Sequence, residues 1–123
     1  MKRVLVLAGL CALMSASLSY SQKKGTTIVG EVVDIVSYMN SGMKPDTPDG
    51  KEVLTASAKG GNHLGILEAK TGKLYIVTMN QANTGANQAL LPFVGMKIAA
   101  TGTVYKRGSC QLLVMTVIGK SIK

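Results

Sequence analysis

The chain has 123 residues, and its 14 Lys and Arg against 6 Asp and Glu give a formal net charge of +8. Hydrophobic residues make up 46% of the chain and charged residues 16%, which excludes a disordered protein, and the length leaves room for one domain but not for a two-domain enzyme. With no Trp, one Phe and four Tyr, little aromatic surface is available for stacking.

Residues 1–21 have the three parts of a secretory signal peptide. Lys2 and Arg3 precede an apolar run over 4–14, and small, mostly polar residues follow over 15–21. The apolar run is shorter than the roughly 20 residues that a membrane span requires. We therefore expect bacterial export to the periplasm or the medium, and cleavage before residue 22 with a cut near residue 16 as the alternative.

The mature domain is expected to cover 22–123 and to have no internal disulfide. Lipidation of Cys11 is disfavoured because the bulky Leu10 precedes it. Removal of the signal peptide leaves Cys110 as the single cysteine, so the domain must be stabilised by its core. The apolar neighbours of Cys110 predict that it faces the interior, and whether it pairs between chains stays open.

The segment 26–38 is rich in β-branched residues and predicts one long strand. Ile28, Gly30 and Val32 share one face at a period of two, and a glycine in mid-strand indicates a sharp bend or a close backbone approach. Asp34, beside the buried face, is expected to accept hydrogen bonds at an edge or turn.

Residues 39–62 form a long first loop, with turn signals at both ends and a short helix expected over 51–58. A hairpin follows, with strands at 63–69 and 73–79 and Gly72 in its turn. A short helix is then expected over 86–91, ending at Pro92.

The last hairpin joins strands at 97–105 and 109–118 through the turn Lys106-Arg107-Gly108. Its first strand repeats the apolar and glycine pattern of the first segment, with Gly102 as the bend. Two bent strands and two hairpins predict an all-β domain with one or two short helices, folded as a five-stranded Greek-key OB barrel. An open sandwich of four or five strands is the alternative.

The chain resembles small exported bacterial OB-fold proteins of unassigned role. The segments that carry this resemblance are 30–34, 59–67, 71–75, 91–98 and 102–105. The resemblance extends over nearly all of the mature chain and implies the fold more than a function. Related sequences often have two cysteines in the helix before the Gly-Gly-Asn turn, where this chain has Val53 and Ser57, so no thiol or thiolate-metal role is implied here.

Enzymatic catalysis is disfavoured, and no cofactor is expected. His63 is the only histidine, Cys110 lies far from it along the chain, and the six carboxylates show no paired arrangement for acid/base work. We therefore expect a non-catalytic binding module that recognises a protein or an anionic envelope ligand through its first and last loops. The candidate ligand-binding residues are Tyr38, Lys44, Lys59, His63, Lys106 and Arg107.

Two alternatives stay open. Periplasmic binding of Cu(I) or another soft metal would use Met39, Met43 and His63, because thioethers and imidazole are soft ligands, although methionine is also common core filler. Oligonucleotide or oligosaccharide binding would use the usual OB face, with Tyr38, Tyr75 and Tyr105 as stacking platforms. Nucleic acid is the less expected partner for an exported protein.

Overall fold

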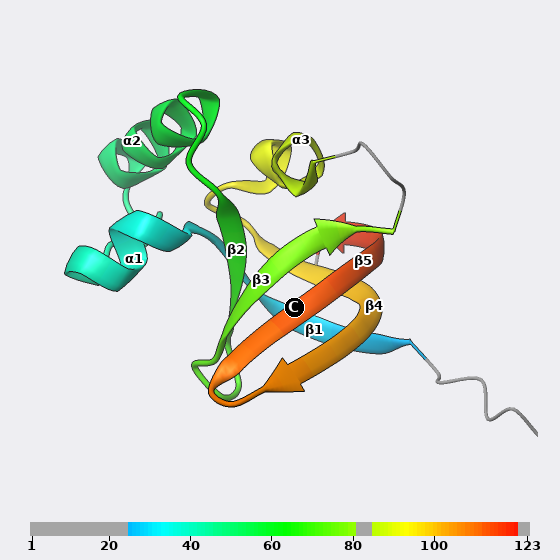
Figure 1. The fold of residues 1–123 in the computed structure, drawn as a ribbon. Coiled ribbons are helices and arrows are strands. Elements are labelled where there is room, and N and C mark those ends of the chain that lie inside the picture. Colours follow the sequence, from blue (N-terminus) through cyan, green and yellow to red (C-terminus); the bar gives the residue numbers. More distant parts are fainter. Residues whose placement is uncertain (1–24, 81–84, 121–123) are drawn as a thin grey trace, which may run out of the picture.

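The computed structural model describes residues 25–80 and 85–120, in which five strands close into a barrel (Figure 1). The strands are β1 (Thr26–Asp34), β2 (Leu64–Glu68), β3 (Leu74–Met79), β4 (Lys97–Arg107) and β5 (Cys110–Lys120). Their order around the barrel is β1-β2-β3-β5-β4, with β4 paired to β1 and β3 parallel to β5. This order confirms the OB-like barrel, and the open sandwich is wrong. The predicted signal peptide over 1–21 lies outside the described residues.

The first strand bends at Gly30 as predicted. β1 pairs with β4 from Thr26 to Glu31 and with β2 from Gly30 to Asp34, so one strand contributes to both halves of the barrel. A Cβ at Gly30 would lie only 2.1 Å from the carbonyl oxygen of Leu67. Glycine is therefore required here by the close approach of two backbones.

The prediction that this strand continues to residue 38 is wrong. β1 ends at Asp34, and α1 (Ile35–Ser41) begins there, because the Asp34 side chain accepts hydrogen bonds from the backbone N–H groups of Val36 and Ser37. Such a cap favours a helix even where β-branched residues favour a strand. The predicted helix over 51–58 is present as the longer α2 (Pro48–Lys59), with Thr47 as its N-cap.

The middle of the chain follows the predicted order of elements. The β2–β3 hairpin has Gly72 in its turn at a φ of 72°, as expected. After it come α3 (Ala86–Leu90) and a 3₁₀ turn, η1 (Leu91–Phe93), which contains Pro92. Asn87 holds α3 against the start of β2, since its side chain accepts from the N–H of Leu64 at 2.9 Å and donates to the carbonyl of Asn62 at 2.6 Å.

The last hairpin is longer than the sequence indicated. β4 and β5 pair from Ile98↔Lys120 to Arg107↔Cys110, so Lys106 and Arg107 belong to β4 and not to the turn. The ladder shifts register between Thr101 and Gly102. A Cβ at Gly102 would lie 2.0 Å from the carbonyl oxygen of Val114. Gly102 is thus the second predicted bend.

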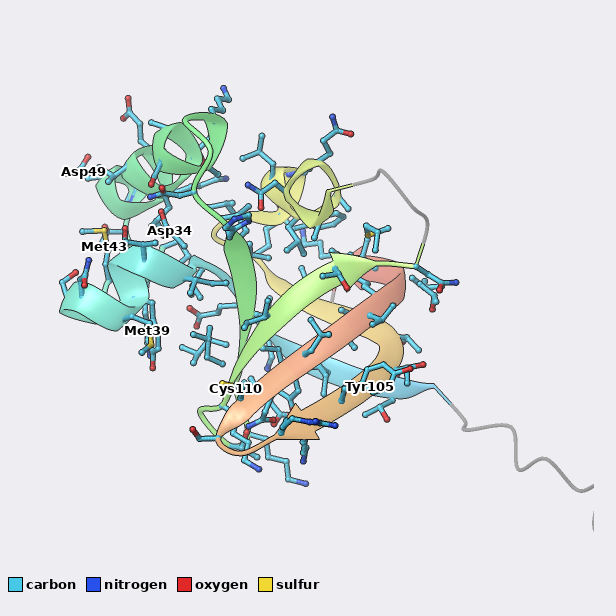
Figure 2. The ribbon with its side chains drawn as sticks, in the orientation of Figure 1. Asp34, Met39, Met43, Asp49, Tyr105 and Cys110 are labelled. Carbon is cyan, nitrogen blue, oxygen red and sulfur yellow. The ribbon has the colours of Figure 1, made fainter. Side chains whose placement is uncertain are left out.

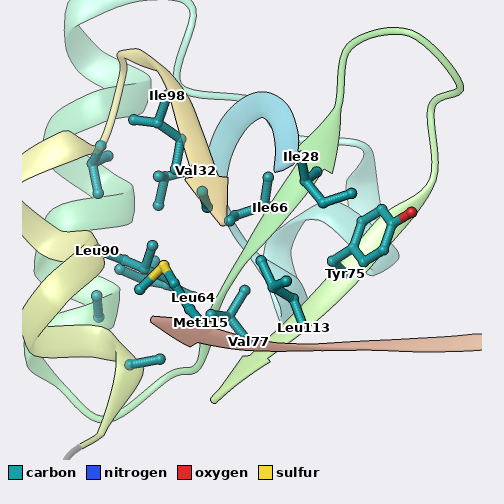
Figure 3. Close-up of a cluster of buried hydrophobic side chains, with 14 of the residues drawn as sticks. Ile28, Val32, Leu64, Ile66, Tyr75, Val77, Leu90, Ile98, Leu113 and Met115 are labelled. Carbon is teal, nitrogen blue, oxygen red and sulfur yellow. The ribbon is translucent and has the colours of Figure 1, made fainter. Parts of the chain in front are cut away.

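One apolar cluster fills the barrel and continues under α2 and α3 (Figure 3). The inward face of each strand contributes to it, and Leu54 and Leu90 close it from α2 and α3. Its fully buried members include Val32, Leu64, Ile66, Ile98, Leu113 and Met115. Met115 therefore packs as core filler.

Candidate functional site

Two adjoining hollows lie on the outside of the barrel between α1 and the β4–β5 turn. The first has a volume of about 410 Å³ and the second about 230 Å³, and they share Ile76, Cys110 and Gln111. The first is also lined by Ile35, Met39, Lys73, Leu74 and Ser109, and the second by Tyr105, Lys106, Arg107 and Leu112. We call the two hollows together the groove.

The floor of the groove is formed by outward-facing residues of β3 and β5. The ladder between these strands begins at Ile76↔Leu112 and continues to Met79↔Met115. Since side chains alternate along a strand, Val77 and Leu113 face the core and Ile76 faces out. Ile76 is 46% exposed, so an apolar side chain is presented to solvent at the centre of the groove.

The first wall is α1, and it is positioned by Asp34. Oδ1 of Asp34 accepts from the N–H groups of Val36 at 2.8 Å and Ser37 at 3.2 Å, while Oδ2 accepts from the hydroxyl of Ser57 and from Nδ2 of Asn62. These bonds join the start of α1 to α2 and to the segment before β2. The wall presents Met39, which is 70% exposed.

Asp34 is fully buried, and hydrogen bonds from backbone and side-chain donors compensate its charge. Burial by itself would raise the pKa of the Asp34 carboxyl. The hydrogen bonds from Ser57, Ser37, Asn62 and Val36 outweigh it and hold the pKa below its ordinary value of 3.8. Asp34 is therefore ionised at neutral pH and is the predicted acceptor at the end of the strand.

The second wall is the β4–β5 hairpin. It turns through Gly108, whose φ of 59° suits glycine, and Ser109, between the paired residues Arg107 and Cys110. Tyr105 is 53% exposed, and Lys106, Arg107 and Cys110 are exposed as well. Figure 2 shows Cys110 beside this turn, at the start of β5.

The prediction that Cys110 faces the interior is wrong. Leu113 and Met115 are the inward residues of β5, and a position three residues before Leu113 falls on the opposite face. Cys110 is a free, exposed thiol that lines both hollows. Because most residues that follow Cys110 are apolar, the sequence does not show which face of this strand is buried.

The groove combines apolar surface with positive charge. Lys73 lines the first hollow, Lys106 and Arg107 line the second, and no Asp or Glu is among the described residues that line either one. The side-chain oxygen of Gln111 is buried and has no hydrogen-bond partner within the described part of the chain. The groove therefore offers cations and apolar contacts.

The structure separates the predicted ligand-binding residues into two sets. Lys106 and Arg107 lie in the groove, and Tyr38 is half-buried on α1. Lys44 is exposed between α1 and α2, and Lys59 lines a different hollow of about 440 Å³ on α2. Figure 1 shows α2 and the β4–β5 turn at opposite ends of the barrel.

His63 and the two methionines of the metal alternative are all exposed. Met39 lines the groove, whereas Met43 lies on the side of α1 that faces α2 (Figure 2). His63 precedes β2, where its carbonyl accepts from the N–H of Ile35 at 3.0 Å. Among residues 25–80 and 85–120, no group of three or more His, Cys, Asp or Glu side chains is arranged to hold a metal ion. The metal alternative stays a prediction.

Of the three tyrosines predicted as stacking platforms, only Tyr105 lines the groove. Tyr75 is a core residue with 4% of its surface exposed, so its assignment as a platform is wrong. Burial, and then the nearby charge of Glu68, raise the pKa of the Tyr75 hydroxyl.

Sequence reasoning missed Ile76, Lys73 and Gln111. The segment 74–77 reads Leu-Tyr-Ile-Val and is apolar at every position, so alternation gave no sign of which side chains are exposed. The groove also depends on β3 and β5 lying side by side, although they are far apart in the sequence.

None of the helices in the described ranges is long and apolar enough to cross a membrane. Comparisons with protein-family models, with curated proteins and with solved structures found no match to this chain. Inferences about function therefore start from the groove itself.

Proposed function

We propose that this chain is an exported, non-catalytic binding module, of the kind found among small bacterial OB-fold proteins, that holds a protein or an anionic envelope ligand in the groove. One observation carries the proposal. Lys73, Lys106 and Arg107 line the same groove as the exposed side chains of Met39 and Ile76, with no carboxylate among the described lining residues. Clustered charge of one sign attracts the opposite charge, and an exposed apolar cluster indicates a contact surface.

The location of the groove supports the same proposal. It lies between the first connection and the last turn, which are the two segments that OB barrels commonly use for binding. The export part of the proposal rests on the sequence over 1–21. The residues proposed to contact the ligand are Lys106 and Arg107, as the sequence predicted, together with Met39, Ile76 and Lys73.

Two charge-reversed variants test the proposal against simple basicity. Lys106→Glu with Arg107→Glu changes the groove, and Lys44→Glu with Lys59→Glu makes the same charge change on exposed residues elsewhere. The probes are dextran sulfate, a polysaccharide-like polyanion, and vesicles that contain phosphatidylglycerol. We expect the groove pair to weaken binding of at least one probe and the control pair to leave it nearly unchanged.

The binding position is measured by amide chemical-shift changes in the ¹⁵N-labelled protein. Shifts centred on residues 73–76 and 105–112 support the groove. Equal loss of binding in both charge pairs, or shifts that follow α2 instead, would overturn the proposal and leave the basic surface as a general electrostatic feature.

A further inference from the structure

We infer that the natural ligand of the groove is a protein segment in which acidic side chains lie close to an apolar side chain. This inference rests on the proposed function and specifies the ligand class. Two properties of the groove carry it: the exposed apolar floor and the cations beside it.

The apolar floor favours a ligand with an apolar group. Ile76 is 46% exposed and Met39 is 70% exposed, and both line the larger hollow. A sulfated or phosphorylated polymer gains nothing from covering these side chains, whereas a Leu, Met or Phe side chain of a peptide removes both surfaces from water. The flexible thioether of Met39 can adapt to different apolar partners.

The cations lie together toward one end of this floor. Lys73 directly precedes β3, and Lys106 and Arg107 pair with the first residues of β5, whereas Ile76 pairs with Leu112 further along the two parallel strands. The positive charge therefore lies next to Ile76 on the side of the β4–β5 turn. Arginine binds carboxylates through two parallel hydrogen bonds. A protein segment with one or more carboxylates close to an apolar side chain is complementary to this arrangement.

Single-stranded nucleic acid is disfavoured as the ligand, since Tyr105 is the only aromatic side chain among the described lining residues and base stacking requires a platform.

The test is selection from a library of random peptides displayed on phage, with the full chain as the immobilised target. We expect the enriched peptides to contain Asp or Glu close to Leu, Met or Phe. Synthetic versions of these peptides are then titrated against the protein by fluorescence anisotropy, beside dextran sulfate and a single-stranded oligothymidine as the competing ligand classes.

Two pairs of variants separate the apolar and the charged parts. Ile76→Ser removes the floor, and Val117→Ser is its matched control, since Val117 is a 63% exposed apolar residue of β5 that does not line the groove. The charge pairs are those at Lys106 with Arg107 and at Lys44 with Lys59. We expect about a tenfold rise in the peptide Kd for each groove variant and less than about twofold for each control.

The outcomes separate this inference from the function on which it rests. Enriched peptides without an apolar residue, or peptide binding unaffected by Ile76→Ser, overturn the inference. Failure to enrich any peptide, with dextran sulfate binding that depends on Lys106 and Arg107, overturns the inference and leaves the proposed function in place. Binding of oligothymidine alone that depends on Lys106 and Arg107 overturns both and favours the oligonucleotide alternative. Absence of groove-dependent binding to every probe overturns both.

Discussion

The two walls of the groove are constructed differently. α1 has only seven residues, buries none of them fully, and is positioned by the contacts of Asp34 with Ser57 and Asn62. The opposite wall is a long antiparallel ladder between β4 and β5, with one register shift between Thr101 and Gly102. A helix this short is not stable alone, whereas the ladder distributes its stability over many backbone hydrogen bonds.

This difference indicates which side of the groove adapts to a ligand. The α1 wall depends on a few polar atoms, so local opening there costs less free energy than separation of β4 from β5. The exposed Met39 lies on this more adaptable wall, and Lys106 and Arg107 lie on the rigid one. We expect the hairpin to set the position of the charges and α1 to adjust to the apolar part of the ligand.

The largest loss of stability is expected from Gly102→Ala, which disturbs the rigid wall formed by β4 and β5. The new Cβ would meet the carbonyl oxygen of Val114 at 2.0 Å, and backbone atoms cannot move aside without breaking the ladder. We expect the free energy of unfolding to fall by about 3 kcal/mol. Urea denaturation followed by circular dichroism measures it.

Gly119→Ala is the matched control on the partner strand. A Cβ at Gly119 would have no atom of the described residues within 4 Å apart from those of its two chain neighbours, so stability should change little. Equal stability of both variants would mean that β4 and β5 do not approach as closely at Gly102 as the structure shows.

A smaller effect, confined to the adaptable wall, is expected from Asp34→Asn. Oδ1 receives two backbone N–H groups, so the amide NH₂ would take the place of Oδ2 and face the donors of Ser57 and Asn62. We expect a loss of about 2 kcal/mol in the free energy of unfolding. In the control Asp49→Asn, at an exposed position in the first turn of α2, about 0.3 kcal/mol is expected.

The same carboxylate makes the α1 wall sensitive to acid. The pKa of folded Asp34 lies below its ordinary value of 3.8, so its ionised form stabilises the folded state above that pH. This contribution is lost as the pH falls through the lower folded pKa. The stability difference between wild type and Asp34→Asn should therefore shrink below about pH 4. A difference that stays constant down to pH 2 would contradict the assignment.

The barrel and the rigid wall could be predicted from the sequence because their signals are local. Alternation around Gly30 and Gly102 marks bent strands, and Gly72 marks a tight turn, so strand number and connection types followed from short segments. The predicted inward face at Ile28, Gly30 and Val32 is the buried one. These features require no knowledge of distant residues.

The adaptable wall could not be predicted in the same way. Ile35 and Val36 have strand propensity, and only Ser57 and Asn62, more than twenty residues away, explain why a buried Asp34 starts a helix there. Tertiary contacts thus override local preference. The groove floor could not be predicted for a related reason. It requires β3 and β5 to lie side by side, and these strands meet only in the folded barrel.

The smallest effect is a chemical one, at Cys110 on the rigid wall. The exposed thiol should react with a thiol reagent at nearly the same rate in the folded protein as in urea, since folding does not cover it. The matched comparison is Leu113→Cys combined with Cys110→Ser, which places the thiol on the buried face of the same strand. With Cys11→Ser in both proteins, the folded-state rate should be at least about a hundredfold lower for the buried thiol. Slow reaction of Cys110 itself would mean that its end of the groove is covered in solution, by another copy of the protein or by a bound molecule.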